Sequence, residues 1–197
     1  MSDIHLEYGY FYHIYNCGIN GENLFIEDDN YRYFMKLYDK HISPIAETYA
    51  WCLMKNHFHF VVKIKDLPIR FSEPDRYIKI KPPHQYFSNL FNAYAKAFNN
   101  RFDRHGSLFE RPFKKKLIDN NEYLRRVIVY SHDNPVHHNF VSHTIEWPWS
   151  SYITVLSSEP TKMMRKEVVE LFGDVENFKF VHEQKIERLE VERYLEL

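Results

Sequence analysis

Apolar and polar positions in the first third of the chain follow the pattern of a small β-sheet. The segment Tyr10 to Asn16 is rich in aromatic and β-branched residues, so we expect a strand there. Ala46 to Met54 and His57 to Ile64 have the same character and are separated by two residues, which predicts a hairpin. A shorter strand is expected at Phe113 to Ile118.

Apolar residues spaced three and four positions apart predict helices between and after these strands. The first helix should begin at a cap formed by Asp28 or Asp29 and end near Ile42. A later helix should end before Pro135, because proline removes a backbone donor. The later helices are expected at Gln85 to Phe102, Asn121 to Asn134, Thr161 to Phe172 and Glu176 to Leu195.

The order of these elements, β-α-β-β-α-β-α, predicts an α+β fold with helices packed on an antiparallel sheet. The stretch from Leu67 to Pro83 holds four prolines and is expected to be a loop. At 197 residues the chain is long enough for one domain with its own core.

Composition points to a soluble protein of the cytoplasm. The two cysteines, Cys17 and Cys52, are far apart, which argues against a disulfide scaffold and against a cysteine zinc site. No apolar run approaches the length of a membrane span, and the N-terminus lacks the pattern of a signal peptide. We therefore expect no membrane partner.

The net charge of −1 argues against a protein that coats DNA without specificity, but the charge is unevenly distributed. Residues 101 to 126 contain eight Lys and Arg against four Asp and Glu, whereas the segment from Lys185 onward is acidic. A local phosphate-binding face is therefore allowed. A solvated strand and helix surface explains the same residues equally well.

Two histidines in the segment Asn56 to Val62 carry the sharpest chemical signal. On a strand, His57 and His59 point to one face, so their imidazoles can both bind one metal ion. Two histidines on the polar face of an amphipathic strand are the alternative. A histidine-triad nucleotide hydrolase is excluded, because it requires a third histidine where this chain has Val61.

A second signal lies on the predicted helix that precedes Pro135. Tyr130 and Asn134 are four residues apart and share a helix face. A phenol one turn from a metal-ligating amide suits covalent catalysis at a phosphodiester. The alternative is a core tyrosine followed by an asparagine that ends a helix.

Five segments together resemble the single-tyrosine HUH transposases, which include insertion-sequence enzymes and REP-associated tyrosine transposases. The resemblance spans roughly residues 8 to 155, in the order and spacing of that family. The five segments are Tyr12 to Gly18, Cys52 to His59, Arg111 to Lys114, Tyr130 to Val136, and Trp147 to Tyr152.

This resemblance implies a ferredoxin- or RRM-like HUH domain that cleaves and rejoins single-stranded or hairpin DNA through a 5′-phosphotyrosine. Tyr130 would be the nucleophile, and His57, His59 and Asn134 would bind Mg²⁺ or Mn²⁺. His132 and Asp133 lie beside Asn134 and keep the third ligand open. Tyr123 is a weaker nucleophile candidate, because Val127 stands where its ligand would be needed.

The same resemblance divides the chain into a catalytic domain, residues 1 to 156, and a helical C-terminal extension of unknown role, residues 157 to 197. It leaves a monomer and a homodimer open. The residues expected to bind the DNA backbone are Arg111, Lys114, Lys115, Lys116, Arg125 and Arg126.

Two rival functions remain beside a transposase-like enzyme. One is a domesticated DNA-binding or regulatory protein that keeps the fold without mobilising DNA. The other is a rolling-circle replication initiator or relaxase, which shares the chemistry but usually carries extra domains for which this chain has little room.

Overall fold

A computed structural model describes residues 5–66 and 81–184 of the chain, and a four-stranded antiparallel sheet lies at its centre. The strand order is β2-β3-β1-β4, and every neighbouring pair is antiparallel. The strands are β1 (Phe11–Cys17), β2 (Ala46–Leu53), β3 (His57–Ile64) and β4 (Lys114–Ile118). The α+β class and the antiparallel sheet predicted from the sequence are thus confirmed, and each predicted strand lies within a residue or two of its expected bounds.

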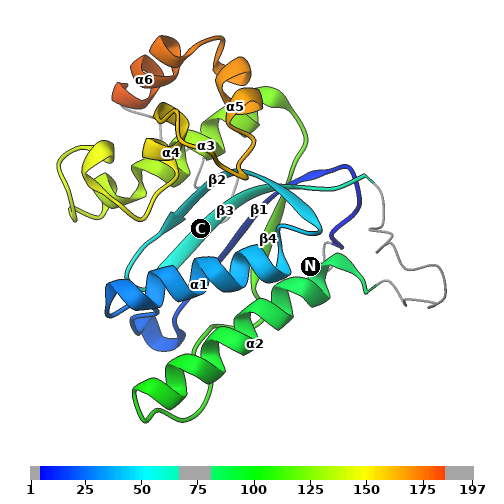
Figure 1. The fold of residues 1–197 in the computed structure, drawn as a ribbon, viewed down its shortest axis with the longest axis vertical. Helices are drawn as coiled ribbons and strands as arrows, with labels where there is room; N and C mark the ends of the chain where they lie inside the picture. The colour runs from blue at the N-terminus through cyan, green and yellow to red at the C-terminus, as the bar shows by residue number, and fades with distance from the viewer. Residues whose placement is uncertain (1–4, 67–80, 185–197) are drawn as a thin grey trace.

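Helices cover both faces of the sheet (Figure 1). α1 and α2 lie side by side on one face, whereas α3 and the helices that follow it lie on the other. The long helices are α1 (Asp28–His41), α2 (Pro83–Arg101) and α3 (Asn121–His137). The shorter ones are α4 (Tyr152–Leu156), α5 (Arg165–Phe172) and α6 (Val175–Glu183), with 3-10 turns η1 (Ile19–Gly21) and η2 (Thr144–Glu146).

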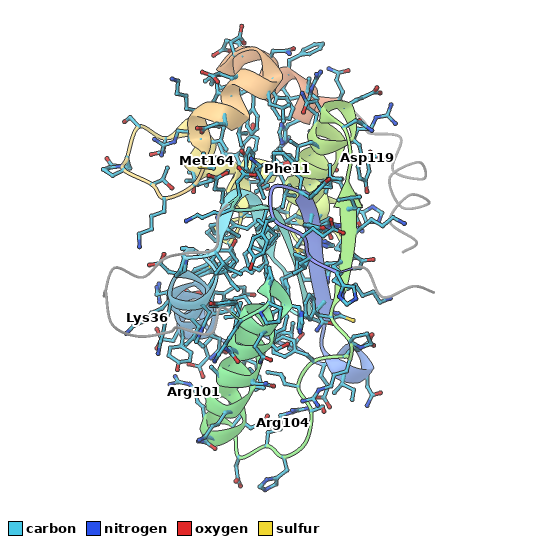
Figure 2. The ribbon with its side chains drawn as sticks, turned by 90° about the vertical axis from the view of Figure 1, so that its right-hand side faces the viewer. Phe11, Lys36, Arg101, Arg104, Asp119 and Met164 are labelled. Atoms are coloured by element: carbon cyan, nitrogen blue, oxygen red, sulfur yellow. The ribbon has the colours of Figure 1, made fainter. Side chains whose placement is uncertain are left out.

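The pleat of the sheet creates two separate apolar layers. Alternate residues of β3, such as Phe58 and Phe60, pack with α1 and α2 in the larger core. The other face contributes Val61 and Ile118 to a second core under α3, α5 and α6. In Figure 2, Met164 lies at the end of the sheet where β1 begins and β4 ends, whereas Arg101 lies at the opposite end of the molecule.

Two boundary predictions on the long helices were wrong, for identifiable reasons. Glu27 rather than Asp28 or Asp29 is the N-cap of α1, and the two aspartates lie in the first turn, where carboxylates favour the positive end of the helix dipole. Pro135 does not end α3, which continues to His137. Pro135 is buried inside the last turn, where its missing N–H costs the helix one hydrogen bond without ending it.

The C-terminal helices also differ from the expectation. α5 begins at Arg165 rather than near Thr161, and α6 ends at Glu183 because Gln184 is extended. The short helix α4 was not predicted at all. The remainder of the helix expected up to Leu195, and most of the loop expected from Leu67, lie outside the described residues.

Candidate active site

The sheet face under α3 carries the two histidines singled out in the sequence. His57 and His59 both lie on β3, and their ring centroids are 5.2 Å apart. His59 is almost completely buried, whereas His57 is partly exposed. The strand pleat therefore places both imidazoles on one face, as the sequence predicted.

Helix α3 brings Tyr130 and Asn134 over the same point of the sheet. The centroids of the Tyr130 and His59 rings are 5.5 Å apart and meet nearly edge to face. One turn later, the Oδ1 atom of Asn134 lies 3.0 Å from Nε2 of His57. The four residues thus converge although they come from segments more than sixty positions apart in the sequence.

The alternative ligands and nucleophile lie elsewhere. His132 turns away from the histidine pair and bonds to His182 and Ser151. Asp133 lines a cavity on the far side of α3, and Tyr123 belongs to the apolar core below it. Of the three neighbouring residues considered as the third ligand, Asn134 is therefore the one that contacts a histidine of the pair.

A cavity of about 380 Å³ opens over these side chains. Its walls include Tyr15 and Asn16 of β1 and Lys114 of β4, besides His137 and His138 at the end of α3. A mixed wall of aromatic rings, imidazoles, amides and one lysine is suited to a phosphate flanked by nucleobases.

Burial keeps the two histidines neutral. Desolvation lowers the pKa of His57 to about 4, with a smaller opposing effect from Asn134. Desolvation and the neighbouring histidines lower the pKa of His59 well below its ordinary value. The Asn134 amide opposes this lowering too, although Nε2 of His59 makes no hydrogen bond among the described residues. Neutral imidazoles are the protonation state that binds metal ions.

Each ring nitrogen of His57 faces an amide oxygen, so at one of them two lone pairs face each other. The Nδ1 atom lies 2.9 Å from Oδ1 of Asn56, and Nε2 lies 3.0 Å from Oδ1 of Asn134. A neutral imidazole has only one N–H, so it cannot donate to both oxygens. With the amides oriented in this way, a cation beside Nε2 and the Asn134 oxygen would satisfy both atoms.

The predicted DNA-binding residues do not form one surface. Lys114 lines the cavity, and Lys116 pairs with His13 in the sheet, so both point to the α3 face. Lys115 and Arg111 line a different cavity of about 800 Å³ that is bounded by α2. Alternation along β4 therefore divides the basic run between the two faces of the sheet.

The two remaining basic residues lie on the exposed side of α3. Arg126 makes an ion pair with Glu122, one turn away, at 2.7 Å. Arg125 beside it is exposed as well.

His13 is a buried residue of this site that was not selected from the sequence. It lies on β1, and its Nε2 atom is 2.9 Å from Nδ1 of His59. A tertiary pairing places it there, because the antiparallel register sets Tyr15 opposite His59 and His13 opposite Val61. The sequence shows that His13 and Tyr15 share one face of their strand. It does not show which face this is, because that depends on the register of β1 against β3.

Residues that follow the resemblance also pack around α3. The side chains of Val168, Phe172 and Phe178 share the apolar core with Val127 of α3. None of the residues that line the 380 Å³ cavity comes from α5 or α6. The described C-terminal helices thus support the helix that carries Tyr130 without lining the cavity.

Two further features are absent from the described part of the chain. Within residues 5–66 and 81–184, no group of three or more His, Cys, Asp and Glu side chains is arranged to hold a metal ion. None of the helices in this part of the chain combines the length and the apolar character needed to cross a membrane.

Comparison with known proteins supports the resemblance noted in the sequence. No protein-family model matches the chain. The chain is 25% identical over 108 residues to a Haemophilus influenzae protein named as a REP-associated tyrosine transposase, over 54% of this chain and 58% of that relative. The chain therefore spans less than two thirds of that relative's length.

A solved structure shares the fold. The structure of a REP-associated tyrosine transposase bound to a REP hairpin matches with a TM-score of 0.58 at 17% identity. The match covers 81% of this chain and 89% of that one. The fold of the present chain is thus that of a single-tyrosine transposase.

Proposed function

We propose that this chain, a relative of the single-tyrosine HUH transposases, cleaves and rejoins single-stranded or hairpin DNA through a phosphotyrosine intermediate with the help of Mg²⁺ or Mn²⁺. The observation that carries the proposal is the convergence of His57, His59 and Asn134 beside the ring of Tyr130 in one cavity. The hairpin is suggested by the DNA in the matching structure.

The donor set fits a divalent cation. Nε2 of His59 is buried and has no hydrogen-bond partner within residues 5–66 and 81–184, and Nε2 of His57 faces the amide oxygen of Asn134. Two neutral imidazole nitrogens and one amide oxygen form a set that Mg²⁺, Mn²⁺ and zinc all accept. When bound, the cation would withdraw charge from the scissile phosphate.

The residues of the chain would supply the remaining chemistry. The Tyr130 hydroxyl oxygen would attack phosphorus, so that a phosphorus–oxygen bond to tyrosine forms and the bond to the 3′ oxygen breaks. The tyrosine proton leaves to solvent or a cavity base, and the departing 3′ oxygen takes up a proton. The energy of the broken phosphodiester is kept in the new one, so a released 3′-hydroxyl can later reverse the step.

The position of the nucleophile supports action within one chain. Tyr130 and His59 approach each other inside a single protomer, so the cavity does not need a second subunit to be complete. We accordingly propose that the monomer is competent. All of the proposed catalytic groups fall within residues 1 to 156, which we propose as the catalytic domain.

Lys114 is the best placed of the basic residues to contact the reacting strand. It lines the cavity, whereas Arg111 and Lys115 would contact DNA only if the strand passed around the edge of the sheet. Phosphate contacts of this kind orient the strand and carry little sequence information.

Labelled hairpin and single-stranded oligonucleotides from the DNA that flanks the gene, resolved on a denaturing gel, test the proposal. Wild type in Mn²⁺ should form a covalent protein–DNA adduct that EDTA prevents. Tyr130→Phe should lose the adduct and keep DNA binding. Tyr123→Phe is a matched control on the same helix, outside the cavity, and should keep the adduct.

Two outcomes would contradict the proposal. An adduct that persists in Tyr130→Phe would show that another residue is the nucleophile. Tight, specific binding of the hairpin without any adduct in Mg²⁺ or Mn²⁺ would favour a domesticated DNA-binding protein of the same fold.

A further inference from the structure

His13 lies at the middle of β1 and is completely buried under α3. Its ring stacks on Tyr15 at 4.7 Å and on His59 at 5.0 Å between centroids. The edge of the Tyr130 ring faces it at 6.4 Å. A polar ring thus lies at the centre of the sheet, in contact with a proposed metal ligand and beside the proposed nucleophile.

The two buried histidines share a single hydrogen bond. Nε2 of His13 lies 2.9 Å from Nδ1 of His59. Both rings are buried, where a charged imidazolium would lose its hydration, and no carboxylate of the described residues forms a hydrogen bond with either ring. Both rings are therefore neutral near pH 7, and each carries one proton.

One proton in each ring allows two arrangements of the pair. In the first, Nδ1–H of His59 donates to Nε2 of His13, and Nε2 of His59 presents a lone pair to the cavity. In the second, Nε2–H of His13 donates to His59, whose own proton then occupies Nε2. A metal ion can bind Nε2 of His59 only in the first arrangement.

We propose that His13 is a positioning residue that accepts the Nδ1 proton of His59 and thereby holds Nε2 of His59 ready to bind a metal ion. Metal-bound histidines usually donate their second N–H to a carboxylate, a backbone carbonyl or water. Here the geometry assigns that role to a second neutral histidine on the neighbouring strand. This inference rests on the proposed function, because it takes His59 as a metal ligand.

A purely structural pair explains the geometry less well. Nδ1 of His13 and Nε2 of His59 are both buried, and neither has a hydrogen-bond partner in the described parts of the chain. Buried polar atoms without partners destabilise a fold, and two apolar side chains would fill the same space without that loss. A metal ion at Nε2 of His59 would satisfy one of the two atoms.

Metal binding without DNA separates this inference from the catalytic one. The full chain would be titrated with Mn²⁺ and the free ion followed by electron paramagnetic resonance. His13→Leu removes the acceptor and keeps an apolar side chain of similar size. His13→Gln offers a side-chain oxygen that can accept from Nδ1–H of His59, and His41→Leu on α1 is the control away from the cavity.

The expected result is a 10- to 100-fold weaker binding of Mn²⁺ by His13→Leu, the usual effect of removing a partner of a metal-bound histidine. His13→Gln should recover most of the affinity, and His41→Leu should match wild type. In the Mg²⁺ form, nitrogen-15 spectra should place the His59 proton on Nδ1 in wild type. Melting temperatures of all variants show whether each is folded.

Equal Mn²⁺ affinity of wild type and folded His13→Leu would overturn the inference, even if DNA cleavage is normal. Failure of His13→Gln to recover affinity, when folded, would overturn it as well. Metal binding that depends on His13 but yields no DNA adduct would instead refute the proposed cleavage and leave the role of His13 standing. Absence of Mn²⁺ binding by wild type would overturn both.

Discussion

Nε2 of His57 lies 3.0 Å from Oδ1 of Asn134, which joins the third strand of the sheet to the last turn of the helix that carries Tyr130. The contact is unusual because His57 also has an oxygen acceptor, that of Asn56, at its other ring nitrogen. A neutral imidazole has one proton for the two oxygens. The same arrangement becomes favourable when a cation lies beside Nε2 and the Asn134 oxygen.

Asn134→Ala should weaken Mn²⁺ binding by at least about 10- to 100-fold. Removal of a hydrogen-bond partner of a metal-bound histidine has an effect of this size, and loss of a ligand should cost no less. Asn134→Asp keeps an oxygen ligand and adds a negative charge, so its Mn²⁺ affinity should equal or exceed that of wild type. Calorimetric titration measures both. Asn99→Ala, whose amide bonds at the far end of α2, is the control. Unchanged affinity of Asn134→Ala would remove this residue from the ligand set.

The metal-free protein should begin to lose stability below about pH 6.5, because its buried histidines are held neutral by the fold. Burial lowers the pKa of His13 to about 3 and that of His182 to about 4, against about 6.5 in the unfolded chain. The unfolded state therefore binds more protons below pH 6.5. Stability is fully present above that pH and is lost as the pH falls toward the folded-state values.

Urea unfolding in EDTA at pH 7 and pH 5 measures this effect. Each of these two histidines should contribute a loss on the order of 2 kcal/mol over that interval. The variant His13→Leu should show a correspondingly smaller loss. A free energy of unfolding that is the same at both pH values would show that these rings are not held neutral by the fold.

Ser151→Ala should destabilise the contact between the C-terminal helices and the sheet. His182 Nδ1–H must donate to the carbonyl of Phe178, so its Nε2 accepts from His132, whose Nε2 in turn accepts from Ser151. The Ser151 oxygen also accepts from the backbone N–H of Trp51. Removal of this hydroxyl takes away the hydrogen-bond partner of the buried Nε2 of His132 and of the partly buried N–H of Trp51.

The expected loss for Ser151→Ala is about 2–4 kcal/mol in the free energy of unfolding, measured with urea. The exposed Ser158→Ala, seven residues later, should change it by less than about 0.5 kcal/mol. If Ser151→Ala is as stable as Ser158→Ala, the hydrogen-bond chain does not hold the C-terminal helices in place.

Lys114→Gln should weaken the binding of single-stranded DNA and reduce its dependence on salt. One lost phosphate contact lowers the slope of log affinity against log salt by roughly 0.7 to 1. Fluorescence anisotropy at several salt concentrations measures that slope. Lys36→Gln on α1, which lies on the opposite face of the sheet, should leave it unchanged. An unchanged slope for Lys114→Gln would place the DNA path away from this cavity.

Sequence patterns were sufficient where a feature depends on near neighbours. Strand pleating alone places His57 and His59 on one face, and helical spacing alone aligns Tyr130 with Asn134. The α+β class followed from the order of strands and helices. The end of α3 was misjudged, because Pro135 is buried inside the last turn and the helix continues to His137.

Features that depend on contacts between distant segments needed the tertiary structure. The register of β1 against β3 brings His13 to His59, and a shift of one residue would turn His13 to the other face of the sheet. The same alternation separates Lys114 from Lys115, which a linear count of charges treats as one patch. The sequence determines which side chains each element presents to a face, since that follows from backbone geometry. Only packing decides which faces meet, because burial of the apolar layers sets the register and the placement of α3 over the histidines.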